Sequence, residues 1–143
     1  MKQKSLLIGL CALVGVATYI NLRPAPADNA SRSTPAVGTA IVAIQMPRLE
    51  GNAVIGQRIF ENACAACHGS NAVGVEGAGP PLIHVIYESS HHADESFQRA
   101  VATGVRSHHW QFGNMPPVEG LTRGDTEMVI QYIREIQRAN GIN

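Results

Sequence analysis

The chain has 143 residues, 45% hydrophobic and 15% charged, a length that suits one domain with additional segments. Its formal net charge is zero at pH 7, but from Asp28 onward it contains eight arginines, no lysine and eleven acidic residues. Nucleic-acid binding usually depends on a clustered basic surface. Because no such patch is present in this sequence, we expect no nucleic-acid partner.

Residues 1–22 have the pattern of a targeting or membrane segment. Lys2 and Lys4 precede the apolar run Leu6–Ile20, and a basic start followed by an apolar stretch is typical of a secretory signal peptide. The run is also close to the shortest helix that crosses a bilayer. The segment is therefore a cleaved signal peptide or an uncleaved anchor, with the anchor slightly favoured. Either one places the following residues in the periplasm or on the outer face of the cytoplasmic membrane.

Residues 23–46 are predicted to form a flexible linker, because Pro, Ala, Ser and Thr predominate there without apolar periodicity. The last part of the linker, Ile41–Met46, is apolar and is expected to pack on the domain as an extended arm. The domain itself is predicted to comprise residues 47–143.

The domain shows helical spacing of apolar residues in three segments, Asn52–Ala65, Asp94–Thr103 and Arg123–Ala139. Asp94 is the expected N-cap of the second helix. Thr122, followed three residues later by Asp125, predicts a capping box at the third. The connections Gly69–Pro81 and Val105–Gly120 are long and rich in Gly and Pro, and loops of that length in a small domain usually have a function.

The stretch Cys64–His68 reads CAACH. Cysteines at positions i and i+3 lie on one face at the end of a helix, where their sulfurs can form thioethers with the two vinyl groups of a haem. The next residue, His68, can then offer an imidazole nitrogen to the iron. C-x-x-C-H is the attachment pattern of c-type haem, so one haem c, covalently bound through Cys64 and Cys67, is the predicted cofactor.

Two other kinds of site share part of this pattern. A thioredoxin-like dithiol is expected in a βαβ context, which this sequence does not show. A zinc site needs a second pair of ligands at suitable spacing, and the sequence has no second C-x-x-C. Thioether attachment also protects both thiols from oxidation in an exported protein.

Four motifs follow one another between residues 50 and 140: GQRIFENACAACHG, GAGPPL, FGNMPP and VIQYIREI. In order and spacing they resemble the class I cytochrome c family, small monohaem bacterial proteins with His/Met ligation. The resemblance implies an all-α cytochrome c fold, in which the N- and C-terminal helices cross beside a covalently attached haem. It puts Gly56, Phe60 and Tyr132 at that crossing, where a glycine allows close approach of the helices.

The resemblance also implies that Met115 is the distal axial ligand of the iron that His68 binds. The local sequence agrees, because the two prolines after Met115 exclude helix and the Gly-Asn pair before it permits a tight turn. His108 and His109 are the alternative ligands, since bis-histidine coordination occurs in other haem proteins.

Three further contacts with the haem site are expected, of which the first, at Pro80, follows from the same resemblance. The carbonyl of Pro80, with Pro81 as the alternative, accepts a hydrogen bond from the axial histidine. Leu82 packs against the haem. Trp110 either donates its indole N–H to a haem propionate or only packs.

Two histidine pairs flank the second predicted helix, namely His91-His92 and His108-His109. They could form an accessory metal site, for instance for copper. Capping, contacts with the haem propionates and plain exposure are the favoured interpretations.

The predicted function is one-electron transfer by a monohaem c-type cytochrome in an extracytoplasmic respiratory or redox chain, without catalytic residues. The expected partners are redox proteins such as a membrane oxidase or reductase, and the membrane itself if the N-terminal segment is not cleaved. We expect a monomer. Two alternatives stay open: a haem-based sensor that binds a ligand when Met115 dissociates, and a haem subunit of a larger oxidoreductase.

Overall fold

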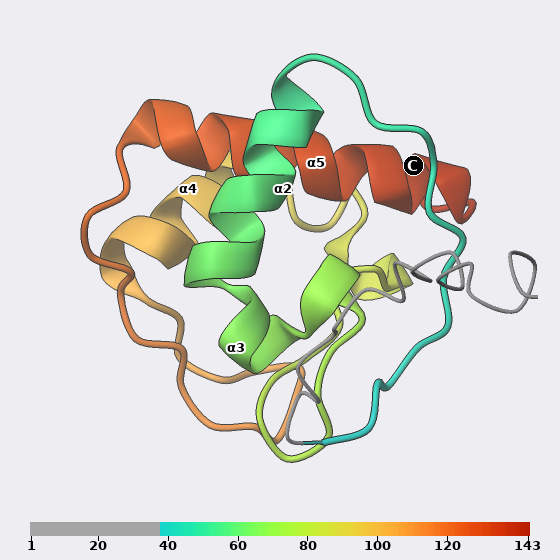
Figure 1. Ribbon diagram of the computed structural model, residues 1–143. Helices are drawn as coiled ribbons and strands as arrows, with labels where there is room; N and C mark the ends of the chain where they lie inside the picture. Colours follow the sequence, from blue (N-terminus) through green and yellow to red (C-terminus); the bar gives the residue numbers. More distant parts are fainter. Residues whose placement is uncertain (1–37) are drawn as a thin grey trace, which may run out of the picture. The chain divides into compact units, whose positions relative to one another are not determined.

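A computed structural model describes residues 38–143. The signal peptide or anchor predicted at residues 1–22, and most of the predicted linker, lie outside the described residues. The described elements, in chain order, are α2 (Asn52–Ala63), α3 (Ala65–His68), the 3₁₀ turns η1 (Ser70–Ala72) and η2 (Val85–Tyr87), α4 (Asp94–Thr103) and α5 (Arg123–Ala139) (Figure 1).

Within residues 38–143 there is no β-strand, and only two isolated β-bridges occur. The all-α fold class is therefore confirmed. The bounds predicted for the second and third helices are those of α4 and α5. None of the described helices is both long and apolar enough to cross a membrane.

Helices α2 and α5 cross in direct contact, as Figure 1 shows. A Cβ atom on Gly56 of α2 would lie 1.9 Å from the backbone oxygen of Met128 in α5, so only glycine permits this approach. Next to it, the rings of Phe60 and Tyr132 lie 5.5 Å apart, and both side chains are fully buried. The predicted crossing, with these residues in it, is confirmed.

The helix predicted at Asn52–Ala65 was too long, because the helix is interrupted at Cys64. Its backbone turns to φ −121°, and α2 ends at Ala63. The N–H of Cys64 still bonds to the carbonyl of Phe60, but its own carbonyl accepts from the N–H groups of Cys67 and His68. The Cys64 carbonyl therefore begins a separate helix, α3, and the two cysteines lie on either side of a bend.

The two later helices differ in how they begin. Thr122 Oγ1 accepts from the N–H of Asp125, and the Asp125 carboxylate accepts from the N–H of Thr122, which confirms the capping box of α5. The N-cap predicted at Asp94 is wrong, because the cap position of α4 is Ala93 and no side chain caps it. The Asp94 carboxylate accepts a hydrogen bond from Arg134 of α5 instead, at 2.8 Å.

Arg134 forms a buried polar link that the sequence analysis did not assign. Only 7% of the residue is exposed. Besides Asp94, its guanidinium donates to the carbonyls of Tyr87 and His92, each at 2.6 Å, and to the side chain of Gln137. This one side chain thus ties α5 to the start of α4 and to the segment before it.

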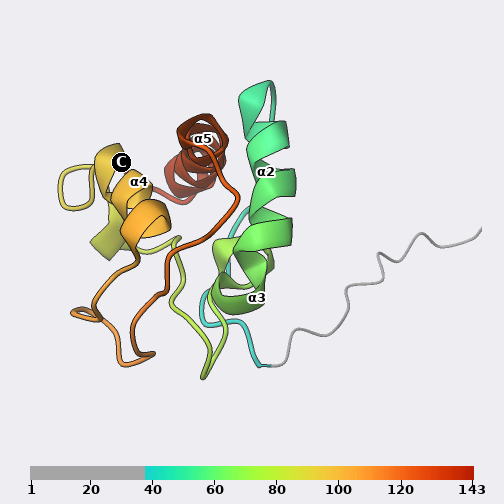
Figure 2. The same ribbon diagram turned by 90° about the vertical axis from the view of Figure 1, so that its left-hand side faces the viewer.

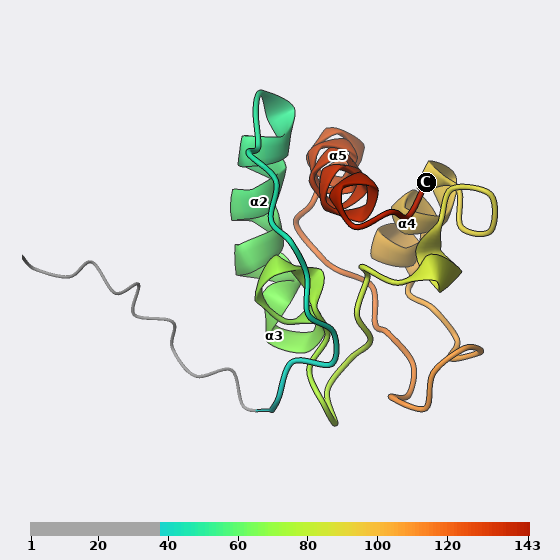
Figure 3. The ribbon, with the colours of Figure 1, turned by 90° about the vertical axis from the view of Figure 1, so that its right-hand side faces the viewer.

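The stretch 41–46 lies along the domain as an extended arm (Figure 3). The N–H groups of Ile41 and Val42 both donate to the carbonyl of Val73. Farther along, the backbone of Gln45 makes two hydrogen bonds with the side chain of Asn140, at 2.8 and 2.9 Å. These contacts join the arm to both the α3–η1 region and the end of α5.

Candidate functional site

A cavity of about 500 Å³ opens between the helices and the loop that joins α4 to α5. Val129, Ile130 and Ile133 of α5 form one apolar wall, and Phe97 of α4 another. Figure 2 shows α3 and the α4–α5 loop facing each other on the two sides of the lower half of the domain. Six of the seven site residues predicted from the sequence line this cavity: Cys64, His68, Pro80, Leu82, Trp110 and Met115.

His68 ends α3, and a hydrogen bond fixes the orientation of its ring. Its Nδ1 lies 2.9 Å from the carbonyl oxygen of Pro80. A carbonyl only accepts, so the proton resides on Nδ1, which leaves the Nε2 lone pair free for a ligand. Burial lowers the pKa of His68, and the Pro80 hydrogen bond opposes that shift only in part. The ring is therefore neutral, as a metal ligand must be.

The turn that carries Pro80 reaches α3 because position 79 is glycine. A Cβ atom on Gly79 would lie 2.7 Å from the backbone oxygen of Cys67. The turn is closed by a bridge between Val75 and Gly79, with N–H to carbonyl distances of 3.0 and 3.1 Å. In the motif GAGPPL, the second glycine thus lets the Pro80 carbonyl approach His68.

Cys64 and Cys67 are not joined in a disulfide. Cys64 lies on the cavity wall, whereas Cys67 is exposed and is not part of that wall. Burial, reinforced by the neighbouring Cys67 and Glu61, raises the pKa of the Cys64 thiol to about 11. A reactive dithiol needs a lowered thiol pKa, so these surroundings disfavour the thioredoxin-like alternative.

The zinc alternative also lacks support in the described part of the chain. Among the described residues, one group of His, Cys, Asp or Glu side chains is close enough to share an ion. It consists of His91, His92 and His109. Neither cysteine belongs to it.

Met115 is held through its backbone. Its N–H and carbonyl bond to the carbonyl and N–H of Val105, at 3.0 and 2.9 Å. A Cβ atom on Gly104 would lie 2.5 Å from the Met115 oxygen, and Gly104 has φ +74°, so glycine is required there on both counts. Asn114 closes the loop by accepting the N–H of Ser107 at 2.9 Å. The Met115 side chain thus lines the cavity from a braced position.

Trp110 presents a buried donor with no acceptor. Among the described residues, its Nε1 is the buried side-chain polar atom without a hydrogen-bond partner. Burial raises the pKa of the nearby Tyr87 hydroxyl, which does not accept a hydrogen bond from the indole. An unpaired buried N–H is costly, so this atom fits a cavity that receives a group bearing an acceptor.

His108 and His109, the alternative axial ligands, lie at the exposed tip of the α4–α5 loop and on the cavity wall. His108 Nδ1 donates to the carbonyl of Arg106 at 2.8 Å. His109 contacts His91, with 3.3 Å between the two Nε2 atoms. The pKa of His109 is lowered, by partial desolvation first and then by repulsion from the neighbouring imidazoles.

Phe97, Phe112 and the apolar face of α5 line the cavity, a role that the sequence did not predict for them. The helical stripe of α5 was visible in the sequence, but a stripe does not tell whether its residues meet another helix or a cofactor. Phe112 had a weaker signal, a large apolar side chain within a polar loop.

A helical fold around an apolar cavity fits a c-type haem protein when a neutral histidine, a methionine, one thiol of a C-x-x-C-H motif and an unpaired N–H donor line that cavity. The family model described as "Cytochrome c" matches residues 53–137, more than half of the chain. The chain therefore belongs to the cytochrome c family. No curated protein and no solved structure was found that matches it. Membership implies a covalently bound haem c and haem-based electron transfer.

Proposed function

We propose that this chain is a monohaem electron carrier, in which Cys64 and Cys67 would attach the haem and His68 and Met115 would bind its iron. The observation that carries the proposal is that both ligands line one apolar cavity while the ring proton of His68 is donated to Pro80. A thioether is a soft ligand that favours ferrous iron. His/Met coordination therefore gives a raised reduction potential.

The bound group supplies a reversible one-electron change at iron. The chain holds both ligands in place and excludes water from the cavity with the apolar face of α5. The backbone pairing of Met115 with Val105 favours a ligand that stays bound in both oxidation states. A ligand set that does not change keeps the reorganisation during electron transfer small.

The same pairing argues against the sensor, in which Met115 would leave the iron to admit a small ligand. A visible and near-infrared spectrum, with and without carbon monoxide, separates the two functions. We expect a methionine–iron charge-transfer band and no binding of carbon monoxide. Rapid binding to the ferrous protein would overturn the carrier proposal.

The sharpest test of the ligand is Met115→Ala, compared with Met46→Ala. Met46 is an exposed methionine of the arm, 41% accessible, and is not on the cavity wall. We expect the Met115 variant to lose the charge-transfer band, to bind carbon monoxide and to have a lower potential, while the Met46 variant keeps the spectrum of the parent. An unchanged spectrum in the Met115 variant would contradict the assignment.

The domain acts in the periplasm or on the outer face of the cytoplasmic membrane, anchored there if residues 1–22 are not cleaved. Lys2 and Lys4 before the apolar run support this location. Its partners are redox proteins such as a membrane oxidase or reductase, which it meets as a monomer. Residues 38–143 contain no lysine, so a neutral or mildly acidic docking face suits these partners.

Cell fractionation tests this location, with the haem protein expected in the membrane or periplasmic fraction. Purification from membranes at low detergent separates a diffusing carrier from a subunit of a larger oxidoreductase. A carrier leaves its partners at moderate salt, because surface charge contacts are screened. A stoichiometric complex that survives salt would favour the subunit.

A further inference from the structure

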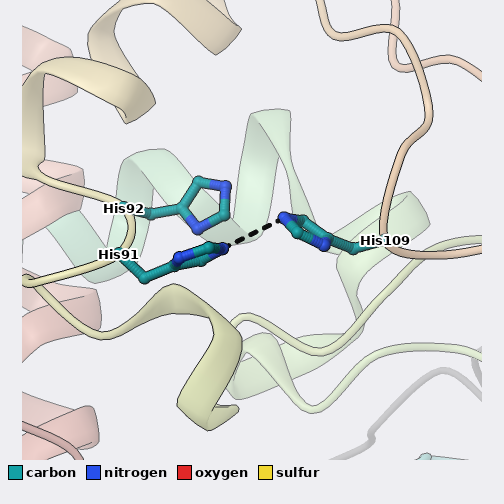
Figure 4. Close-up of side chains that lie close together, drawn as sticks. All are labelled: His91, His92 and His109. Carbon is teal, nitrogen blue, oxygen red and sulfur yellow. Dashed lines mark hydrogen bonds between the residues drawn. The ribbon is translucent and has the colours of Figure 1, made fainter.

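Four histidines from two separate segments meet at the rim of the cavity. His91 and His92 precede α4, and His108 and His109 lie on the loop that follows it. One ring nitrogen from each of His91, His92 and His109 lies within 4.8 Å of the other two. Figure 4 shows His91 and His92 on one side, with His109 reaching toward them from the other.

The spacing of the closest pair suits a metal ion. The Nε2 atoms of His91 and His109 are 3.3 Å apart. Two imidazole nitrogens bound tetrahedrally at about 2.0–2.1 Å from one ion are separated by about 3.3–3.4 Å. Without an ion, one ring donates a hydrogen bond to the other. With an ion, both lone pairs turn toward it from nearly the same positions.

The third ring is supported in the way that a ligating histidine usually is. His92 Nδ1 lies 2.6 Å from the carbonyl of Ile86, to which it donates its proton, and this leaves Nε2 for a metal. The backbone of His92 is also held, because its carbonyl accepts from the buried guanidinium of Arg134 at 2.6 Å. A fixed tautomer and a fixed backbone lower the cost of assembling a site.

We propose that His91, His92 and His109 bind one late first-row divalent metal ion, with Cu²⁺ preferred over Zn²⁺ and water at the open position. The three side chains offer only imidazole nitrogens, which suit Cu, Ni and Zn, whereas Mg and Ca prefer oxygen ligands. The preference for copper follows from the general order of divalent affinities. His108, with its ring centroid 4.2 Å from that of His109, is a neighbour rather than a ligand.

The bound ion links two segments of the chain, because its ligands His91 and His109 are 18 residues apart in the sequence. One segment leads into α4, and the other carries Met115, six residues after His109. The ion therefore braces the loop on the Met115 side of the cavity. The metal site does not depend on the electron-carrier proposal, because neither His68 nor Met115 takes part in it.

The first test is calorimetric titration of the haem-loaded full chain, without a histidine tag, with Zn²⁺, which is redox-inert. We expect one equivalent to bind. His91→Ala and His109→Ala should each weaken binding at least about 100-fold, because loss of an outer-shell partner alone costs 10–100-fold. Equal affinity in the parent protein and in these variants would overturn the site.

The matched control is His84→Asn. His84 is a nearby histidine outside the group, which packs on Trp110 and accepts the N–H of Ile86 through Nδ1. Asn keeps an acceptor at that position, so this variant should bind Zn²⁺ like the parent. His108→Ala should weaken binding less than about tenfold, because His108 bonds to the carbonyl of Arg106 and not to a proposed ligand, whereas the loss of an outer-shell partner costs about 10–100-fold. A larger loss would replace the three-histidine site with one that includes His108.

The second test identifies the ligands directly. Electron paramagnetic resonance of the Cu²⁺-loaded protein should show couplings to three imidazole nitrogens, of which one is lost in His109→Ala. Far-ultraviolet circular dichroism and the haem absorption of each variant, compared with the parent, establish that the fold is intact. Copper signals without nitrogen couplings in the parent protein would overturn the proposal.

Discussion

The two sides of the cavity hold their proposed ligands by different means. On one side, His68 ends a four-residue helix and its ring is bonded to Pro80, so the orientation of the side chain is fixed. On the other, Met115 lies in a loop and its backbone is paired with Val105. A planar imidazole must be aimed, whereas a thioether on a flexible stem adapts once its backbone is positioned. The rigid His68 ring is therefore held by a side-chain hydrogen bond, whereas the flexible Met115 side chain is positioned through its backbone.

The largest effect should come from removing the attachment on the His68 side. In the double variant Cys64→Ala/Cys67→Ala no thioether can form, so we expect haem to be lost when the protein is denatured in acidified organic solvent. The parent should keep its haem under these conditions. Cys11→Ala removes the third cysteine of the chain and serves as the control, with haem retained. Retention by the double variant would contradict attachment at CAACH.

The helix crossing supports both sides together and can be broken with a single methyl group. In Gly56→Ala the new Cβ would meet the Met128 backbone at 1.9 Å, and backbone cannot yield as a side chain can. We expect the free energy of unfolding in urea to fall by about 3 kcal/mol or more. Gly124→Ala places the same methyl group near only Thr122 Oγ1, at 3.7 Å. It should leave stability unchanged or raise it by up to about 1 kcal/mol.

A substitution at Gly104 should loosen the Met115 side alone. Alanine there combines an unfavourable φ of +74° with a 2.5 Å contact to the Met115 oxygen. We expect a loss of about 2–4 kcal/mol of stability, together with new binding of carbon monoxide. Gly113→Ala shares the unfavourable φ, at +86°, but its Cβ meets no atom within 4 Å. Carbon monoxide binding by both variants alike would show that φ strain, not displacement of Met115, is responsible.

The smallest of these effects should come from the buried link made by Arg134, which touches neither proposed ligand. Arg134→Met removes the donors to the carbonyls of Tyr87 and His92. We expect about 2 kcal/mol of stability to be lost, the usual cost of buried acceptors left unpaired. Arg123→Met breaks the exposed pair with Glu95 and should have a smaller effect in the same unfolding measurement. Equal effects would mean that Arg134 contributes only as a surface charge.

The sequence predicted features that depend on neighbours along the chain. The bounds of α4 and α5 and the Thr122–Asp125 capping box follow from local spacing, and the structure has them. The helix crossing at Gly56 was expected only from the resemblance to the cytochrome c family, and the structure has it too. The bend at Cys64 could not be predicted, because nothing in CAACH distinguishes one helix from two. Arg134 could not be assigned either, since an arginine on an amphipathic helix is usually solvated.

Which of the histidines come together could not be predicted from local sequence either. His91 and His109 are 18 residues apart, and only the packing of α4 and the closed loop after it brings their rings together. The two histidine pairs suggested an accessory metal site from the sequence, but which of the four histidines share it depends on tertiary structure. C-x-x-C-H, in contrast, could be recognised from spacing alone. The haem roles of Cys64, Cys67, His68, Pro80, Leu82, Trp110 and Met115 stay predictions.

The backbone bridge between Val105 and Met115 also offers a way to measure how often Met115 can leave the iron. Both amide hydrogens are held in that bridge, so each exchanges with solvent deuterium only when the bridge opens. If Met115 leaves the iron by way of that opening, the rate of opening sets an upper limit on the rate of ligand release. Amide exchange reports that rate at high pH, where every opening leads to exchange. Measured on oxidised and reduced protein in turn, it would report how firmly each oxidation state keeps its methionine.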